Sequence, residues 1–229
     1  MEYKHRKTNG GTAVIITSLA GAGGIGFVAL GVLTNIGYLR GGLPAPGSGK
    51  PLKEVTDALA AMGDRLKRPS VLVPATWLFL TFFAAGLLSA LWRGEARTDG
   101  WALAGFAGVL MQNAAFMVVE ALRFGAASAA VHHRGSVPGL WAVTNVLFGF
   151  NQAFLAIALL GFTVAGSSLD FIPTWHAWLG YASAALLFVS SAAAPYNVDG
   201  TNRIAITGLV GWLGWATWIV AYGVALLNL

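Results

Sequence analysis

The stretch WALAGFAGVLMQNAAFMVVEALRFGAASAAV, residues 101–131, decides the fold class of this chain. It contains 31 residues, of which Glu120 and Arg123 are the two with charged side chains. A helix of about 20 apolar residues is long enough to cross the hydrocarbon core of a bilayer. The stretch therefore predicts a membrane-spanning helix that carries two charges along its length.

Five further apolar segments of similar length lie along the chain, separated by glycine, proline and charged residues. The six predicted spans cover residues 12–38, 71–92, 101–131, 138–165, 175–195 and 204–227. Of the 229 residues, 56% are apolar and 10% are charged, whereas soluble domains carry about 25% charged residues. This composition argues against a soluble enzyme or a nucleic-acid binder. It predicts an all-α, polytopic membrane helix bundle that forms one domain over residues 1–229.

The connection between the first two spans contains a different helix pattern. Apolar residues recur there at intervals of three and four, at Leu52, Val55, Leu59, Met62 and Leu66. This spacing gives a helix one apolar face, so the sequence predicts one interfacial amphipathic helix over residues 52–66. Such a helix can lie in the plane of the membrane interface, or it can pack over the end of the bundle.

The net charge of +5 comes largely from basic residues near the ends of apolar segments, which suits lipid headgroups rather than nucleic acid. With the N-terminus inside, five Lys and Arg residues lie inside and eight lie outside. By the positive-inside rule, this count favours both termini outside. Six of the eight, however, fall in the first connection, and a basic cluster near the N-terminus often dominates. We therefore expect a protein of the bacterial cytoplasmic membrane with both termini in the cytoplasm.

Two motifs that resemble cofactor or metal sites have simpler explanations. Residues 21–26, GAGGIG, match the glycine pattern of a dinucleotide-binding turn, but no acidic residue lies between this motif and Glu54 to hold a ribose. Small residues also let membrane helices pack closely. His132, His133 and His176 lie at segment ends, where we expect them at the interface, and they lack the spacing of helical zinc ligands. The chain has no cysteine, and we expect no metal and no cofactor.

The strongest candidate for a functional site is a polar face shared by the third and fourth spans. In the third span Glu120 and Arg123 are three residues apart, and Asn113 lies two turns before Glu120. In the fourth span polar side chains recur at helical spacing, at Thr144, Asn145, Asn151 and Gln152. A short connection makes the two spans antiparallel neighbours. We expect Glu120 and Arg123 to point into the bundle near Asn145, and Asn113 to lie near the later polar residues of the fourth span.

Three interpretations of this polar face are open. It can join the helices by hydrogen bonds, bind the polar head of a small amphiphile, or transfer a proton at Glu120. In the second case Trp215 and Trp218 of the sixth span, which belong to an aromatic stripe, would cover the apolar body of the ligand. The candidate ligand-binding residues are then Glu120, Arg123, Asn113, Asn145, Asn151, Gln152, Trp215 and Trp218.

The layout of the chain resembles bacterial six-helix membrane proteins grouped as a family of unknown function. The shared features are a glycine-rich first span, an amphipathic stretch after it, and a loop reading FIPTWHAWLG at residues 171–180. This resemblance implies no activity. Residues 113–120 are also similar to a span of small integral-membrane terpene cyclases, in which an acid protonates an isoprenoid. This chain departs from that pattern because no second acid lies within a predicted span.

These observations favour a non-catalytic integral membrane protein that binds a hydrophobic small molecule or a lipid, or that acts as a subunit of a membrane complex. The alternative is an intramembrane enzyme, cyclase-like or isomerase-like, with Glu120 as acid or base. A transporter is least favoured, because the charged residues gather in one span. The expected partners are membrane lipids, a hydrophobic small molecule and a membrane protein, with no nucleic acid.

Overall fold

The helices of this chain follow its apolar segments. The computed structural model describes the backbone of residues 5–45 and 48–228, and the side chains of residues 17–45 and 48–228. The elements are α1 (His5–Gly41), α2 (Leu52–Met62), α3 (Asp64–Ser70), α4 (Val73–Leu91), α5 (Ala96–His132), η1 (Arg134–Ser136), α6 (Val137–Ser168), α7 (Thr174–Ala192), η2 (Ala194–Asn197) and α8 (Ala205–Leu227). No strand occurs in these described ranges, and the predicted all-α helix bundle is confirmed.

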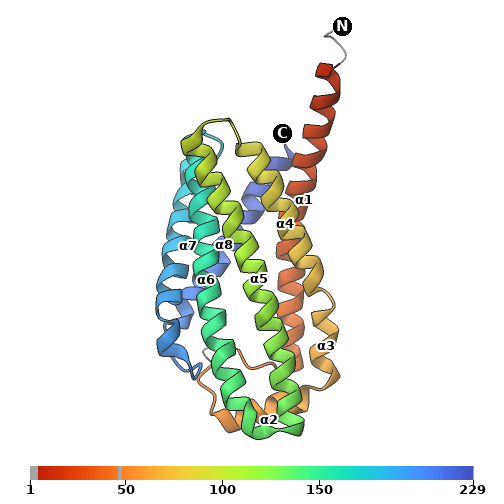
Figure 1. Cartoon of the computed structure of the whole chain (residues 1–229), viewed down its shortest axis with the longest axis vertical. Helices are drawn as coiled ribbons and strands as arrows, with labels where there is room; N and C mark the ends of the chain where they lie inside the picture. The colour runs from red at the N-terminus through yellow and green to blue at the C-terminus, as the bar shows by residue number, and fades with distance from the viewer. Residues whose placement is uncertain (1–4, 46–47, 229) are drawn as a thin grey trace.

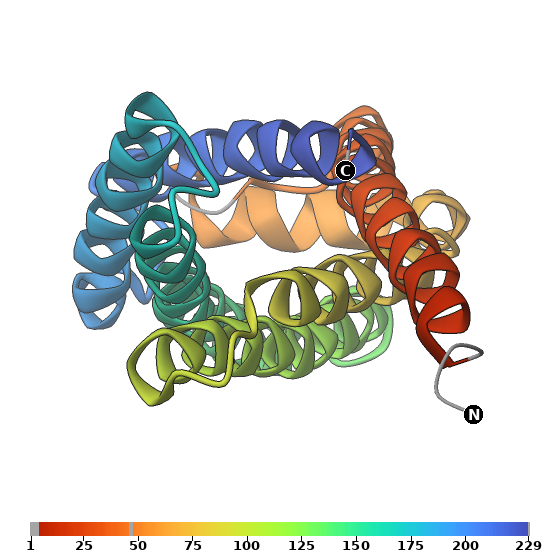
Figure 2. The same cartoon turned by 90° about the horizontal axis from the view of Figure 1, so that it is seen from above.

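The long helices form a closed ring (Figure 2). In order around the ring the neighbours are α1, α4, α5, α6, α7 and α8, and α8 packs back against α1. The short helix α2 lies across one end of the ring, beside the turn between α5 and α6 (Figure 1). The start of α1 and the end of α8 lie toward the opposite end (Figure 1).

Five stretches of helix in the described part of the chain are long and apolar enough to cross a membrane. They are Thr17–Gly41, Asp64–Leu91, Ala96–His132, Arg134–Ser168 and Ala205–Leu227. The remaining predicted span, at residues 175–195, corresponds to α7, which has 19 residues but is not among the five. Its buried side includes the polar residues His176, Ser183, Ser190 and Ser191. Helix α7 is nevertheless a full member of the ring, because it packs between α6 and α8.

Glycine residues set the close approach of α5 and α6. A methyl group added to Gly161 would lie 2.4 Å from the backbone nitrogen of Gly105. One added to Gly108 would lie 2.6 Å from the backbone nitrogen of Ala158. The two backbones are therefore in contact, as small residues allow in membrane helices.

The glycine run of α1 has the same role. A methyl group on Gly21 would lie 2.6 Å from the carbonyl oxygen of Gly223 in α8, and one on Gly24 would lie 2.7 Å from the Phe83 ring in α4. The packing interpretation of residues 21–26 is confirmed, and α1 closes the ring by contacts with both of its neighbours.

The predicted amphipathic helix is present, but it is broken near its end. Gly63 has a φ of +47°, which favours glycine, and it separates α2 from α3. The prediction of one continuous helix over residues 52–66 is therefore wrong. The apolar residues of α2 and α3 form a second hydrophobic core with the end of the ring, at Tyr38, Val55, Leu59, Met62, Leu66, Ala126 and Trp141. Helix α2 thus packs over the end of the bundle.

Candidate functional site

Glu120 and Arg123 point into the ring, as predicted. Their exposed fractions are 5% and 9%, and Arg123 Nη1 donates a hydrogen bond of 2.7 Å to Glu120 Oε2. The pair forms because residues three apart share one face of a helix. Its orientation follows from the cost of exposing charged groups to hydrocarbon.

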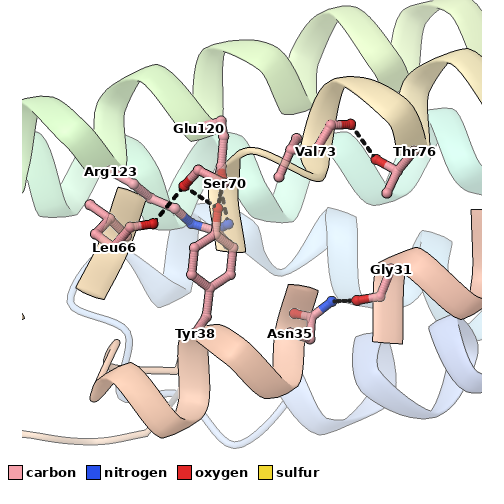
Figure 3. Close-up of polar contacts among 9 residues, drawn as sticks. All are labelled: Gly31, Asn35, Tyr38, Leu66, Ser70, Val73, Thr76, Glu120 and Arg123. Atoms are coloured by element: carbon pink, nitrogen blue, oxygen red, sulfur yellow. Dashed lines mark hydrogen bonds and ion pairs between the residues drawn. The ribbon is translucent and has the colours of Figure 1, made fainter. Parts of the chain in front are cut away.

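Two residues outside α5 complete this ion pair (Figure 3). The Tyr38 hydroxyl, from the last turns of α1, donates a hydrogen bond to Glu120 Oε1. The Tyr38 oxygen also lies 2.8 Å from Ser70 Oγ at the end of α3, and Ser70 Oγ lies 2.8 Å from the Leu66 carbonyl oxygen. Both carboxylate oxygens of Glu120 are therefore bonded, and the site joins α1, α3 and α5.

Aromatic rings surround the guanidinium group of Arg123. Its Cζ atom lies 5.2 Å from the centre of the Tyr38 ring and 5.4 Å from that of Phe116. Phe116 in turn contacts Phe148 of α6, with ring centres 6.3 Å apart. A cation over an aromatic face is stabilised electrostatically, more so when it is shielded from water. Arg123 is thus held by one carboxylate and two rings.

A small cavity borders Arg123. Its volume is about 20 Å³, which is room for about one water molecule. The walls include Leu59 of α2, Arg123 and Ala126 of α5, and Thr144, Asn145 and Phe148 of α6. Arg123 and Asn145 therefore border the same space, as predicted from the antiparallel pairing of the two spans. The cavity is too small for an amphiphile of lipid size.

Asn145 connects α6 to the segment between α7 and α8. Its Nδ2 atom donates a hydrogen bond of 3.1 Å to the Val198 carbonyl oxygen. The same part of α6 carries an open groove of about 400 Å³, with almost entirely apolar walls. The groove is lined by Ala142, Val143, Val146, Leu147, Phe150 and Val198. Asn145 thus fixes the position of one wall of this groove.

The other predicted amides do not gather around Glu120. Asn113 Nδ2 donates to Thr81 Oγ1 over 3.1 Å and to the Trp77 carbonyl oxygen over 3.4 Å, both in α4. Its hydrogen bonds thus go to α4, and the predicted nearness of Asn113 to Asn151 and Gln152 stays a prediction. Gln152 lies against α8 instead, because a methyl group on Gly208 would be 2.3 Å from its Oε1 atom.

The polar face predicted for the third and fourth spans contains buried amide oxygens that accept no hydrogen bond from the described residues. Four predicted site residues have a buried side-chain oxygen without a hydrogen-bond partner among the described residues, namely Asn113, Asn145, Asn151 and Gln152. Glu120 differs from them, because both of its oxygens are already bonded. A further hydrogen-bond donor would therefore find its acceptor in these amides and not in Glu120.

Trp215 and Trp218 do not join the site at Glu120. The Trp218 Nε1 atom and Thr163 Oγ1 both pack against Gly180. Thr163 follows Asn145 by 18 residues on α6, which corresponds to roughly 27 Å along the helix. Trp215 contacts Phe27, with ring centres 5.1 Å apart. The tryptophans of α8 therefore do not lie beside Glu120. The sequence could not predict this, because spacing along α8 does not fix the depth of α8 relative to α5.

His176 belongs to this second, aromatic cluster. It is buried, with an exposed fraction of 2%, and its Nε2 atom lies 3.0 Å from the Trp218 carbonyl oxygen. Its ring packs against those of Trp175, Trp218 and Tyr222. His176 thus lies in the first turn of α7, packed among aromatic rings. Among the described residues, no group of three His, Asp or Glu side chains is placed to hold a metal ion.

The sequence reasoning missed Tyr38 and Ser70. Tyr38 precedes Glu120 by 82 positions, and no motif relates the two. The available signal was indirect: a buried carboxylate needs donors beyond one arginine, and hydroxyl groups near the end of the first span could supply them.

No protein-family model, curated protein or solved structure matches the chain. The resemblance to bacterial six-helix membrane proteins stays an expectation, and function has to be argued from the geometry.

Proposed function

We propose that this chain is an integral membrane protein with a binding rather than a catalytic role, and that the groove on α6 holds the apolar chain of a lipid or of a similar hydrophobic molecule. The groove itself carries the proposal. Its volume is about 400 Å³, and it is open along one side, so a bound chain would stay in contact with the surrounding lipid. Its walls are apolar, as a hydrocarbon chain requires.

The position of the groove supports a ligand that comes from the bilayer. It opens outward on α6, where Val143 is 54% exposed and Phe150 is 45% exposed. Helix α6 lies within Arg134–Ser168, one of the five stretches apolar enough to cross a membrane. A hydrocarbon chain in the surrounding bilayer can therefore enter the groove sideways, without opening of the ring.

The groove is also preformed. Its wall at Val198 is held to α6 by the hydrogen bond from Asn145, and the backbone of Gly200 lies against the same amide. A preformed site loses less conformational entropy when its ligand binds. Asn145 therefore keeps a place in the proposed site, although it supports the wall and does not line the groove.

The geometry gives less support to an enzyme that uses Glu120. A general acid or base must reach the reacting atom of its substrate, but both Glu120 oxygens are bonded to Tyr38 and Arg123. The adjacent cavity has room for about one water molecule. The Glu120 cluster is better explained as the structural joint between α1, α3 and α5.

Photocrosslinking tests the proposal. A photoreactive fatty acid added to membranes that contain the chain should label residues 142–150. Val143→Trp fills the groove and should reduce this labelling several-fold. Ile157→Trp is the matched control, because Ile157 is an exposed apolar residue of α6 outside the groove, and it should leave the labelling unchanged. Equal labelling in both variants, or crosslinks from this segment to another protein in place of the fatty acid, would contradict the proposal.

A further inference from the structure

A cluster of arginines lies on the side of the ring away from the α6 groove, where α1 ends against α3. Its members are Arg40, Arg65 and Arg68, and all three are exposed. A methyl group on Gly41 would lie 3.6 Å from the Arg65 carbonyl oxygen, and one on Gly37 would lie 2.8 Å from the Pro69 side chain. The end of α1 and helix α3 are thus in direct contact, which brings the arginines of both helices to one corner.

This arginine corner has an excess of positive charge. The nearest acid in sequence, Asp64, forms an ion pair of 2.8 Å with Lys67. The buried Glu120 pairs with Arg123. Arg40, Arg65 and Arg68 take part in none of the ion pairs found among the described residues. Asp64 also interacts electrostatically with Arg68, so a single nearby carboxylate faces four basic groups, Arg40, Arg65, Lys67 and Arg68.

Exposed apolar side chains lie next to the arginine corner, in the apolar stretches that adjoin it. Leu39 directly precedes Arg40 and is 64% exposed, and Val71 begins the apolar segment after Arg68 and is 76% exposed. Both belong to stretches that are apolar enough to cross a membrane, Thr17–Gly41 and Asp64–Leu91. Basic groups next to exposed apolar groups match the two parts of a phospholipid, a charged phosphate and its acyl chains.

We propose that the arginine corner binds the headgroup of an anionic phospholipid, with the acyl chains against Leu39 and Val71. Guanidinium groups form paired hydrogen bonds to phosphate oxygens, and long basic side chains reach from the hydrocarbon edge to the headgroup level. Clusters of basic residues just outside a spanning helix are a recurrent feature of anionic-lipid recognition. This site is separate from the α6 groove, since α1 and α6 are not neighbours in the ring.

Native mass spectrometry of the detergent-purified chain tests the proposal. Phosphatidylglycerol should be retained in preference to phosphatidylcholine. The triple variant Arg40→Gln, Arg65→Gln, Arg68→Gln should reduce the retention of phosphatidylglycerol by at least about tenfold. The control is Arg93→Gln, Arg97→Gln, which removes two exposed arginines from the connection between α4 and α5 at the other end of the ring. It should retain the lipid as the unaltered chain does.

Additional experiments distinguish binding of a lipid from binding of a free anion. Inorganic phosphate should not displace the lipid, and Leu39→Ser, Val71→Ser should weaken retention while all three arginines remain. The melting temperature in phosphatidylcholine shows whether each variant is folded, and single Arg→Gln variants replace the triple variant if it does not fold. Unchanged preference in the arginine variants, equal loss in the Arg93 and Arg97 control, or displacement by phosphate would overturn the proposal. Success or failure at the α6 groove does not affect these outcomes.

Discussion

The Tyr38 hydroxyl donates a hydrogen bond to Glu120 Oε1, and this bond joins α1 to α5 across 82 positions of the chain. In the ring, α1 and α5 are separated by α4. The contact therefore ties together two helices that are not adjacent, at the end of the ring covered by α2.

Removal of this hydroxyl should destabilise the fold without changing the shape of the side chain. Tyr38→Phe leaves Glu120 Oε1 buried without its donor, which costs about 1–3 kcal/mol. We expect a lower melting temperature in detergent. The control is Tyr196→Phe, because Tyr196 is 80% exposed, and its melting temperature should match that of the unaltered chain. Equal melting temperatures for the two variants would mean that the bond contributes nothing.

Breaking the ion pair from one side should be more damaging than replacing both partners. Glu120→Ala leaves the Arg123 charge buried and unpaired, with an expected cost of about 3–5 kcal/mol. The double variant Glu120→Leu, Arg123→Met removes both charges and should recover part of that loss. Denaturant unfolding of the two variants measures the difference. If the double variant is less stable than Glu120→Ala, the prediction is wrong, and the ion pair stabilises the fold by more than the cost of burying its two charges.

Two glycines in the same helix should respond oppositely to alanine. Gly108→Ala places a methyl group 2.6 Å from the backbone of α6 and should destabilise the chain, whereas Gly125 has no neighbour within 4 Å of the added atom. Gly125→Ala should raise helix stability by up to about 1 kcal/mol. Thermal unfolding of both variants checks the contact. A similar response at both positions would place the close approach of α5 and α6 elsewhere.

The charge distribution predicts the orientation of the ring. The first connection folds onto the end of the ring as α2 and α3, and a hydrogen bond of 3.2 Å joins Gly49 to Gly200 of the connection before α8. Its six basic residues therefore lie close to the spans, where the positive-inside rule applies fully. We therefore predict that the α2 end lies in the cytoplasm and that both termini lie outside, which is opposite to the orientation expected from the N-terminal cluster.

The absence of cysteine makes this orientation measurable. Ser136→Cys places a thiol at the α2 end, and Ser168→Cys places one at the far end of α6; both positions are exposed. A membrane-impermeant maleimide should label Ser168→Cys in intact cells, and label Ser136→Cys only after the membrane is opened. The reverse pattern would restore the orientation with both termini in the cytoplasm.

Attachment of α2 should weaken in acid. Hydrogen bonds from Lys53 and Arg134 hold the pKa of Asp57 below its ordinary value of 3.8. The stabilisation is therefore present above about pH 4 and is lost as the pH falls through the lowered pKa. The gap in melting temperature between the unaltered chain and Asp57→Asn should be small, because these groups are exposed, and should close in acid. Asp199→Asn, which changes an exposed acid without an ion pair among the described residues, should show no such gap.

The sequence predicted those features that depend on local spacing. Span length and hydropathy placed the long helices, and the three-residue separation of Glu120 and Arg123 predicted their pairing. The short connection between α5 and α6 predicted that Arg123 and Asn145 share one space. Each of these inferences depends on residues of one helix, or of two helices that are consecutive in the chain.

Features that depend on helix depth could not be predicted in this way. Whether Trp218 reaches Glu120 depends on how far α8 is shifted along the ring, and no local pattern records that shift. The contact of Tyr38 with Glu120 depends on the path of α1 past α3. The break at Gly63 separates two helices whose apolar residues have the spacing of one continuous helix, so periodicity alone does not reveal it.

The contact between Gly21 and Gly223 has a consequence for biosynthesis. Chains are made from the N-terminus, so α1 enters the membrane long before the helix that covers its glycine face. During translation that face stays uncovered until α8 has been made, and α8 then completes the ring. Truncation before Gly223 would therefore leave the glycine face of α1 without its contact to α8.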